Sequence, residues 1–344
     1  MAEVRPSKAP TINDIAREAG VSKSAVSLAL LGQGRLSEET RERILRVAQR
    51  LGYVKNAMAQ GLVASRTFTL GMLVRDASRP FYGHLQTLLQ ARAVHHGYRV
   101  VTTTGAREFA LEEERRGLQT LLSLRVEGLI VCSGLLPVDD IVPFTERVPT
   151  VVAGRPEHHP AVSSVFCDEE DGAEQLVDHL LGLGHRSVVV LLVPERQSLT
   201  EHRRGAAMVR RLREAGAAVT EVEASTPGVT AEGATAAVLG DPAVTAVMCP
   251  SDWTLVAVLE AFREAGIRVP DDVSATGYDG VGELTTPLLG LTTLYQPLDE
   301  IAKRAVDLLV EQLGVSAQPV RHIALRGTLR VGTTTASPTR RARS

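Results

Sequence analysis

Aromatic residues, cysteines and long apolar runs are all scarce in this chain of 344 residues. Aromatic residues make up 3% of it, whereas valine, leucine, alanine and isoleucine are plentiful, a composition that suits an α/β protein with buried strands. The length allows two or three domains. No run approaches the ~18 uncharged apolar residues of a membrane span. The N-terminal residues lack the apolar stretch of a signal peptide, so we expect a cytoplasmic protein with no membrane partner.

The sequence also lacks the signatures of disulfide, metal, cofactor and catalytic sites. Its three cysteines, Cys132, Cys167 and Cys249, are far apart and odd in number, which excludes a disulfide framework and a C-x-x-C site. No G-x-S-x-G, P-loop, G-x-G-x-x-G or H-E-x-x-H motif occurs. Two histidine pairs lack partners at metal-ligand spacing, namely His95-His96 and His158-His159. We therefore expect no catalytic residue, no bound metal and no cofactor.

The net charge of −2 argues against nucleic acid only if charge is spread evenly, and it is not. Residues 1–66 hold eleven basic and six acidic residues, a net charge of +5. The remainder holds 27 basic and 34 acidic residues, a net charge of −7. A small basic head on a large acidic body is typical of a nucleic-acid-binding module joined to another domain. A solvated helical surface explains the same charge pattern, so charge alone leaves both interpretations open.

Capping and stop signals predict three short helices in the head, over residues 11–19, 22–31 and 37–51. Thr11 can cap the first helix with Asp14 near the positive end of its dipole, and Gly20 ends it. The first two helices are joined by a tight Ala-Gly-Val turn, and the third completes a small core. This pattern predicts a helix-turn-helix whose second helix enters the major groove.

The head resembles the DNA-binding domain of the lac repressor (LacI/GalR) family. The resemblance runs through TINDIAREAGVSKSAVSLAL and LSEETRERILRVAQRLGYVKNAMAQGLVASRT, about sixty consecutive residues. It includes the Leu-Gly-Tyr53 end of the third helix and the pattern Asn56-Ala-x-Ala59-x-x-Leu62. It implies a double-stranded DNA operator as partner. The candidate DNA-contacting residues are Thr11, Ser22, Lys23, Ser24, Ser27, Leu28, Arg35, Ser37, Thr40, Tyr53, Lys55, Asn56, Ala59 and Leu62.

The segment Asn56–Ala64 is too short to form a stable helix alone in water. The resemblance implies that it is the hinge helix, which pairs across a dimer and lies in the minor groove. Leu62 then matches the leucine wedge that partly unstacks a base step and kinks DNA. The alternative is an interdomain linker with Leu62 in a core.

The head departs from the family pattern in two places. The usual Thr-Val-Ser-Arg of the recognition helix is Ala-Val-Ser-Leu28 here, and leucine cannot donate hydrogen bonds to guanine as arginine does. Leu28 is left to touch a thymine methyl or to pack within the head. The usual Pro-Asn before the hinge is Lys55-Asn56, which adds a possible phosphate contact.

Beyond residue 66, apolar runs typical of strands alternate with helical stretches. The predicted strands are 68–74, 98–103, 128–132, 150–153, 187–193, 245–248 and 273–277. Helices are predicted over 81–96, 172–181, 204–215 and 254–265. The alternation indicates βαβ units and parallel sheets covered on both faces, and about 270 residues favour two lobes. Ligands of such folds bind at the carboxyl ends of the strands.

The family resemblance continues through the body, on Arg79-Pro-Phe-Tyr82, Gly184-His-Arg186, the block Val269–Asp279 and Leu291-Thr-Thr293. It implies the fold of periplasmic sugar-binding proteins and a sugar-like effector in the cleft. Arg204 would donate hydrogen bonds to the effector, with Arg203 as the alternative register, and Asp279 would accept them. The candidate effector-binding residues are Phe81, Tyr82, Arg204, Ser251, Trp253 and Asp279. Each also has an ordinary explanation, as a core aromatic, a solvated charge or a turn residue.

The predicted fold class is an all-α helix-turn-helix head plus a two-lobed α/β body, periplasmic-binding-protein-like, with parallel sheets. The predicted boundaries are 1–55 for the DNA-binding domain, 56–66 for the hinge, 67–335 for the body and 336–344 for a disordered basic tail. Within the body, one lobe takes about 67–166 plus 296–330 and the other 167–295.

The leading functional hypothesis is an effector-controlled transcription regulator, acting as a homodimer on a near-palindromic operator. A binding module of transport type is a second hypothesis. A cytoplasmic enzyme with Asp271, Asp272 and Asp279 as acid–base groups is a third.

Overall fold

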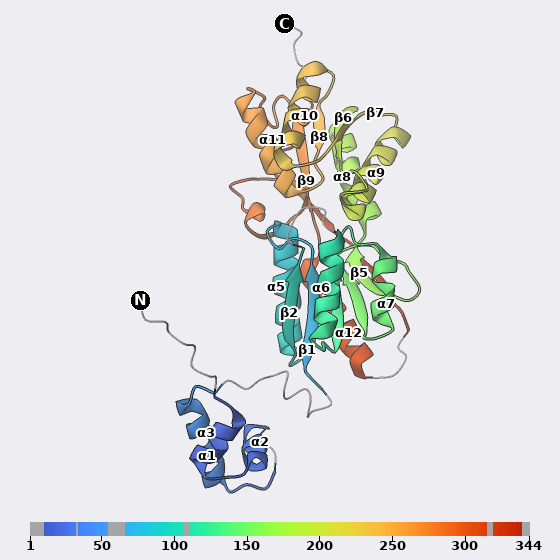
Figure 1. The fold of residues 1–344 in the computed structure, drawn as a ribbon. Helices are drawn as coiled ribbons and strands as arrows, with labels where there is room; N and C mark the ends of the chain where they lie inside the picture. Colours follow the sequence, from blue (N-terminus) through green and yellow to red (C-terminus); the bar gives the residue numbers. More distant parts are fainter. Residues whose placement is uncertain (1–9, 32–33, 54–65, 106–110, 315–318, 339–344) are drawn as a thin grey trace. The chain divides into compact units, whose positions relative to one another are not determined.

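The computed structural model describes residues 10–31, 34–53, 66–105, 111–314 and 319–338. The chain divides into two compact units, residues 1–67 and 68–344 (Figure 1), which are called the head and the body below. The predicted hinge residues Lys55, Asn56, Ala59 and Leu62 lie outside the described residues.

The described head contains three helices, α1 (Ile12–Ala19), α2 (Lys23–Leu31) and α3 (Glu38–Arg50). The predicted cap of α1 is present, because Asp14 accepts hydrogen bonds from the backbone N–H of Thr11 at 2.9 Å and from its hydroxyl at 2.7 Å. Gly20 ends this helix in the left-handed region, with φ 67°. Ile15, Val26 and Ile44 are fully buried, one from each helix, and close a small apolar core.

The first lobe of the body, called lobe 1, is built on a parallel sheet in the order β11-β5-β4-β3-β1-β2. Its strands are β1 (Thr69–Val74), β2 (Arg99–Thr104), β3 (Gly128–Cys132), β4 (Thr150–Ala153), β5 (Ser163–Cys167) and β11 (His322–Leu325). Helices α5 (Pro80–His95) and α12 (Leu298–Gly314) pack into one apolar cluster with this sheet. Helix α6 (Leu111–Ser123) and the short α7 (Val142–Thr145) pack into another.

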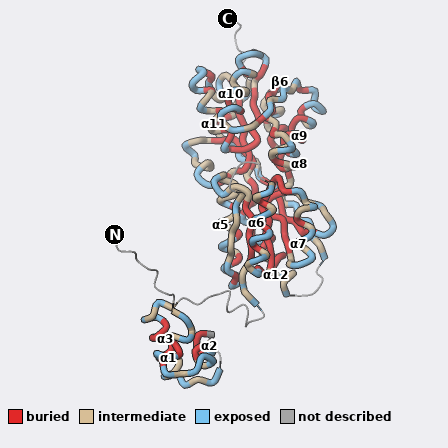
Figure 2. Tube along the Cα trace, in the orientation of Figure 1, coloured by how far each residue is buried: buried red, intermediate tan, exposed pale blue. Residues whose placement is uncertain are grey.

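The second lobe, called lobe 2, is built on a sheet in the order β12-β10-β9-β8-β6-β7. Its strands are β6 (Ser187–Leu192), β7 (Ala218–Glu223), β8 (Ala246–Met248), β9 (Ser274–Asp279), β10 (Thr292–Tyr295) and β12 (Thr328–Arg330). Helices α8 (Glu169–Leu183) and α9 (Leu199–Glu214) pack with one cluster of buried residues. Helices α10 (Pro227–Gly240) and α11 (Asp252–Glu264) pack with the other, and Figure 2 shows burial concentrated in the strands.

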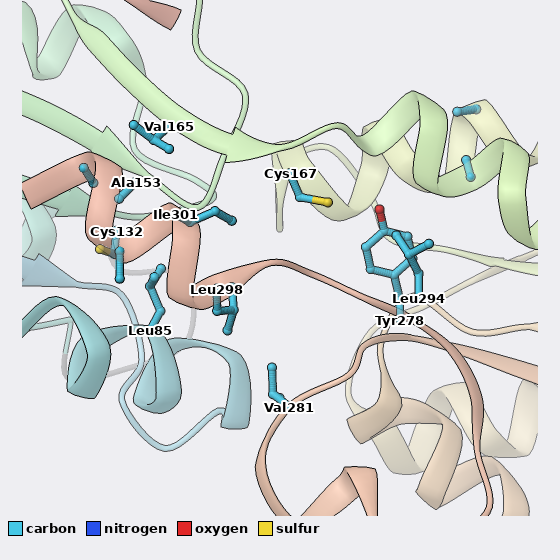
Figure 3. Packing of buried hydrophobic residues seen from close by; sticks show 14 of the residues in the cluster. Leu85, Cys132, Ala153, Val165, Cys167, Tyr278, Val281, Leu294, Leu298 and Ile301 are labelled. Carbon is cyan, nitrogen blue, oxygen red and sulfur yellow. The ribbon is translucent and has the colours of Figure 1, made fainter. Parts of the chain in front are cut away.

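The chain passes between the lobes three times, after β5, after β10 and between β11 and β12. Buried side chains line these passages (Figure 3), with Leu298 and Ile301 of α12 toward lobe 1 and Tyr278 with Leu294 toward lobe 2. Tyr278 and Leu294 approach α8 so closely that a Cβ on Gly172 would lie 2.2 Å from the Tyr278 Oη. Glycine at this helix position therefore lets α8 sit directly on the end of the sheet.

The predicted fold class is confirmed, with local corrections. The strand β12 runs antiparallel to β10, so lobe 2 is not wholly parallel. The sequence analysis missed five strands, namely β5, β7, β10, β11 and β12. These strands are short, rich in serine or threonine, or exposed at a sheet edge. The predicted disordered tail begins too early, since Ala336 exchanges hydrogen bonds with Ser274 and accepts one from His185 Nε2 at 2.9 Å.

Candidate functional site

The second helix of the head presents a polar face at its N-terminal end. Lys23 and Ser24 are exposed, Leu28 is 37% exposed, and Ser27 is half-buried. Val26 and Ala29 point into the core, so the outward set is the one that the helical spacing predicts. Helix α2 therefore offers its first two turns to a partner, which is the geometry of a recognition helix.

The other described DNA-contact candidates have structural roles that leave part of their surface open. Ser22 and Ser37 accept hydrogen bonds from the backbone N–H groups of Ala25 and Thr40, as helix caps. Tyr53 is half-buried against the head core, and its backbone N–H donates to Ala48. Ser22 and Ser37 therefore lie at helix starts, a common position for phosphate binding. Thr11, Thr40 and Arg35 also lie at helix starts or in the loop before α3.

In the body, all six predicted effector-binding residues line one cavity between the lobes. Phe81 and Tyr82 come from the first turn of α5 in lobe 1, with their rings edge to face at 5.2 Å. Lobe 2 contributes the other predicted residues, Arg204, Ser251, Trp253 and Asp279. The remaining lining residues are Arg75, Arg79, Pro80, Gly154, Ser198, Thr200, Glu201, Val281 and Leu284.

Arg204 is the most constrained residue of this cavity. It is 3% exposed, and its guanidinium lies 3.7 Å from the ring centre of Tyr278. Its Nε and Nη2 donate to Glu169 at 2.9 and 3.2 Å. Its Nη1 donates to the carbonyl of Pro250 at 2.8 Å and to Asp279 at 3.2 Å. Four of the hydrogen-bond donations available to arginine are thus made within the protein. Arg203 is exposed and is not among the lining residues of the cavity, whereas Arg204 is buried and lines it.

The Arg204 contacts join two of the passages between the lobes. Glu169 begins α8 directly after β5, and Asp279, at the end of β9, accepts a hydrogen bond from Gln296, which follows β10. Although burial opposes its charge, Glu169 and Asp279 raise the pKa of Arg204 well above its usual range. The guanidinium therefore contacts one lobe connection directly, through Glu169, and the second indirectly, through Asp279 and Gln296.

More carboxyls than cations surround this position, and their pKa values reflect it. Burial, only partly offset by Arg204, raises the pKa of Asp279 to about 8. Burial likewise raises the pKa of Asp252 to about 6, although Asp252 accepts a hydrogen bond from the backbone N–H of Gly280 at 2.8 Å. Burial therefore opposes the charge of both carboxyls, and Arg204 only partly offsets this effect on their pKa values.

The raised pKa of Asp279 predicts that the body loses stability as pH rises. The folded protein binds this proton more tightly than the unfolded chain, so stability falls between about pH 4 and pH 8. The expected slope is at most ~1.4 kcal/mol per pH unit. Urea unfolding of the wild type and of Asp279→Asn from pH 5 to 8.5 measures it. Asn also tolerates the φ of 106° at this position. A difference in the free energy of unfolding between the two proteins that stays constant with pH would contradict the prediction.

Tyr82 links the aromatic wall of the cavity to the other lobe. Its hydroxyl accepts a hydrogen bond from the backbone N–H of Gly134 at 3.0 Å. The carbonyl of Gly134 in turn accepts one from the N–H of Leu199 in lobe 2 at 2.8 Å. Trp253 lies across the cavity and is 47% exposed, so its ring remains accessible to a ligand.

Comparison with known proteins matches two family models to separate parts of the chain. Residues 11–56 match the model of bacterial regulatory proteins of the lacI family, and residues 177–335 match a periplasmic binding protein-like domain. Catabolite control protein A of Priestia megaterium is 27% identical over 308 residues, covering 88% of this chain and 92% of that protein. The HTH-type transcriptional repressor CytR of Escherichia coli (strain K12) is 28% identical over 312 residues, covering 89% and 90%.

Among solved structures, the lac repressor dimer bound to operator and the anti-inducer ONPF superposes with a TM-score of 0.81. The two are 25% identical, and the match covers 96% of this chain and 100% of that one. The chain carries a lacI-type helix-turn-helix domain and a periplasmic binding protein-like domain. These matches confirm the resemblance to the lac repressor family seen in the sequence, and the structural similarity covers 96% of the chain.

Sequence reasoning missed a charged residue of the cavity and two partners of its lining residues. Arg75 lines the cavity and directly follows β1. Glu169, two residues after β5, binds Arg204, and Gln296, directly after β10, binds Asp279. The sequence signal for such residues is a polar residue just after a predicted parallel strand. The carboxyl ends of parallel strands meet at one edge of the sheet, where ligands bind. Two of those strands, β5 and β10, were themselves not predicted, so their ends were not searched.

The alternative acid–base grouping is wrong. Asp271 and Asp272 precede β9 and lie beside Arg268, whereas Asp279 ends that strand. A six-residue strand at ~3.3 Å per residue separates them by about 20 Å. In the described part of the chain, no cluster of three or more histidine, cysteine or carboxylate side chains has the geometry of a metal site. No described helix is long and apolar enough to cross a membrane.

Proposed function

We propose that this chain is a transcription repressor that binds a near-palindromic operator as a homodimer and responds to a small sugar-like effector between its lobes. The observation that carries the proposal is the exposed polar N-terminal end of α2 within a helix-turn-helix head. The chain has the fold of the lac repressor over nearly its whole length, and that repressor was solved as a dimer on its operator. One short recognition helix reads too few base pairs for useful specificity, which favours a dimer.

The DNA-contact residues of the head form the first part of this proposal. Lys23, Ser24, Ser27 and Leu28 face base edges, and the helix starts at Thr11, Ser22 and Ser37 receive phosphates. Lys55, Asn56, Ala59 and Leu62 act in the minor groove as the hinge, with Leu62 as the wedge. We place the protein in the cytoplasm with the DNA, and we assign it no catalytic step.

Coupling between effector and operator follows from the three passages between the lobes. Arg204 and Asp279 hold the ends of two of them, so a ligand that contacts Asp279 acts on the connections that set the lobe angle. A change in that angle in both protomers moves the paired hinge segments and alters operator affinity. Effector binding and operator binding are then coupled, with either sign, because each depends on which of two conformations the body adopts.

Operator binding tests the head. Genome-wide mapping of bound DNA identifies the operator, and fluorescence anisotropy then gives its affinity at several salt concentrations. Lys23→Ala should weaken binding to the operator more than binding to unrelated DNA, because Lys23 faces base edges. Lys303→Ala, at an exposed lysine of α12, is the matched control and should leave both affinities unchanged. A wild-type chain with no salt-dependent DNA binding would exclude a DNA-binding function.

The hinge role of Leu62 has a separate test. Leu62→Ala should lower operator affinity about tenfold or more, equivalent to ~1.4 kcal/mol, and reduce DNA bending. Leu288→Ala changes an equally apolar residue that is 91% exposed in the body, and it should alter neither. Unchanged affinity and bending in Leu62→Ala would show that this segment is a linker.

A further inference from the structure

Helix α2 holds few of the side chains that read base pairs by hydrogen bonds. Its nine residues, Lys23–Leu31, include no arginine, asparagine, glutamine or acidic residue, and Lys23 is its one charged residue. In the major groove, arginine or lysine binds guanine, asparagine or glutamine binds adenine, and an acidic residue accepts a hydrogen bond from cytosine. A recognition helix of this composition therefore has Lys23, serine hydroxyl groups and apolar side chains with which to distinguish base pairs.

The serines in and next to this helix add little discrimination. Ser22, the residue before α2, accepts a hydrogen bond from the backbone N–H of Ala25 at 3.1 Å and so serves as a cap. Ser24 is exposed, and Ser27 is half-buried. A serine hydroxyl both donates and accepts a hydrogen bond, so it can bind the edge of any base pair. Apolar side chains on the open face of α2 therefore decide part of the specificity.

Leu28 is the large apolar side chain on that open face. It lies one turn beyond Ser24, because residues four apart in an α-helix share a face. Leu28 is 37% exposed, whereas Val26 and Ala29 of the same helix are buried. Among the described residues, the apolar core cluster of the head does not include Leu28. Of the two roles open to Leu28, packing in the core of the head is therefore not the one that the structure shows.

Gly34, in the loop before α3, holds Leu28 from one side. A Cβ placed on Gly34 would lie 3.1 Å from Leu28 Cδ1 and 3.3 Å from its Cβ and Cδ2. Because Gly34 has φ 83° and no side chain, its backbone can pass directly beside the leucine. Contact on one side limits the rotamers of the leucine, so less side-chain entropy is lost when its exposed side meets a ligand. Leu28 is therefore a partly fixed apolar group on the face of α2 that the proposed function assigns to DNA.

Thymine is the base whose edge suits such a group. Its C5-methyl group is apolar and faces the major groove, where guanine, adenine and cytosine present hydrogen-bond donors and acceptors. A leucine against those polar edges displaces water without replacing its hydrogen bonds, which costs affinity. Contact with the thymine methyl group instead buries apolar surface on both sides and stabilises the complex. The same side chain therefore favours thymine and disfavours the other three bases.

We propose that Leu28 is a specificity-determining residue, which reads one thymine in each operator half-site by contact with the C5-methyl group of that base. The inference rests on the proposed function, since it names a base contact of the same recognition helix. It goes further in fixing the identity of one base and the chemical group that distinguishes it. It also assigns this discrimination to apolar contact rather than to hydrogen bonds.

Removal of single methyl groups from DNA tests the inference on the full chain. In vitro selection from random duplex DNA gives the half-site sequence, and each thymine in it is then replaced by deoxyuridine, which forms the same base pair without the methyl group. Fluorescence anisotropy measures the affinity of the wild type, Leu28→Ala and Leu28→Met for each duplex. Leu45→Ala, which truncates a leucine of α3 that is 41% exposed, is the matched control.

At one thymine position, we expect deoxyuridine to lower the wild-type affinity about fourfold in one half-site and about fifteenfold in both, the effect of one buried methyl group per contact. Leu28→Ala should bind the thymine and deoxyuridine duplexes equally, with the affinity that the wild type has for deoxyuridine. Such binding also shows that the head of this variant is folded. Leu28→Met, which keeps an apolar side chain, and Leu45→Ala should still prefer thymine.

Three results overturn the inference while the proposed function stands, because in each the wild type still binds its operator. The first is a half-site that has no thymine or loses every thymine methyl group without loss of affinity. The second is a methyl preference that Leu28→Ala retains in full, because another residue then makes the contact. The third is a Leu28→Ala variant that binds neither duplex, because the leucine then has a structural role. A wild type that selects no duplex sequence overturns the proposed function and the inference together.

Discussion

Replacing Arg204 by methionine is expected to lower the free energy of unfolding of the body by about 3–5 kcal/mol. The substitution leaves Glu169 buried without its cation and removes the hydrogen bond to the Pro250 carbonyl. Breaking one side of a buried ion pair costs more than the pair contributes, because the remaining charge stays desolvated. Urea unfolding followed through Trp253, the one tryptophan of the chain, measures the loss in the body.

Two further variants establish the cause. Glu169→Met/Arg204→Met removes both buried charges, and its loss should be clearly smaller than the sum of the two single losses. Arg263→Met changes an exposed arginine of α11 and should fall within ~0.5 kcal/mol of the wild type. A loss below ~1 kcal/mol in Arg204→Met would falsify the role of Arg204 as a buried clamp between the lobe connections.

Replacing Ile44 by alanine is expected to unfold the head while leaving the body intact. Ile44 is fully buried at the centre of the three helices, and such a truncation costs about 2–5 kcal/mol. A domain this small rarely has more than ~3–5 kcal/mol of stability, so most molecules would carry an unfolded head. Operator affinity, measured by anisotropy, falls in proportion to the folded fraction, about tenfold or more.

The neighbouring residue supplies the control for this prediction. Leu45 lies on the same helix but is 41% exposed, so Leu45→Ala should cost less than ~0.5 kcal/mol. Unfolding of the body, followed through Trp253, should have the same midpoint in the wild type and both variants. Operator binding by Ile44→Ala at wild-type strength would show that DNA contact, not the apolar core, holds the head together.

The head was largely predictable because its signals are local. A cap such as Thr11 with Asp14, a stop such as Gly20 and apolar positions at helical spacing all act within one or two turns. The body was predictable in class, because alternating strands and helices allow few topologies. Its short strands were missed, since β5 and β10 carry serine or threonine and depend on neighbouring strands for their pairing.

The candidate cavity shows where sequence reasoning ends. Phe81, Tyr82, Arg204, Ser251, Trp253 and Asp279 come from distant segments, and the structure places all six around one space. Sequence reasoning assigned Arg204 to the effector as a hydrogen-bond donor. The structure shows its donors bound to Glu169, 35 residues away, and to Asp279, 75 residues away. Arg75 was not considered at all, although it faces the same space.

The sequence by itself determined the helix-turn-helix, the uneven charge and the α/β class, because each depends on local spacing or on composition. Only the tertiary structure decided which charged side chains gather around the cavity. Their positions depend on which residues meet at the carboxyl ends of the parallel strands, and long-range strand pairing brings those ends together. Arg204 is enclosed there by Glu169 and Asp279, and Arg75 and Arg79 line the same cavity. The chemistry of the site was therefore decided by pairings that span the whole body.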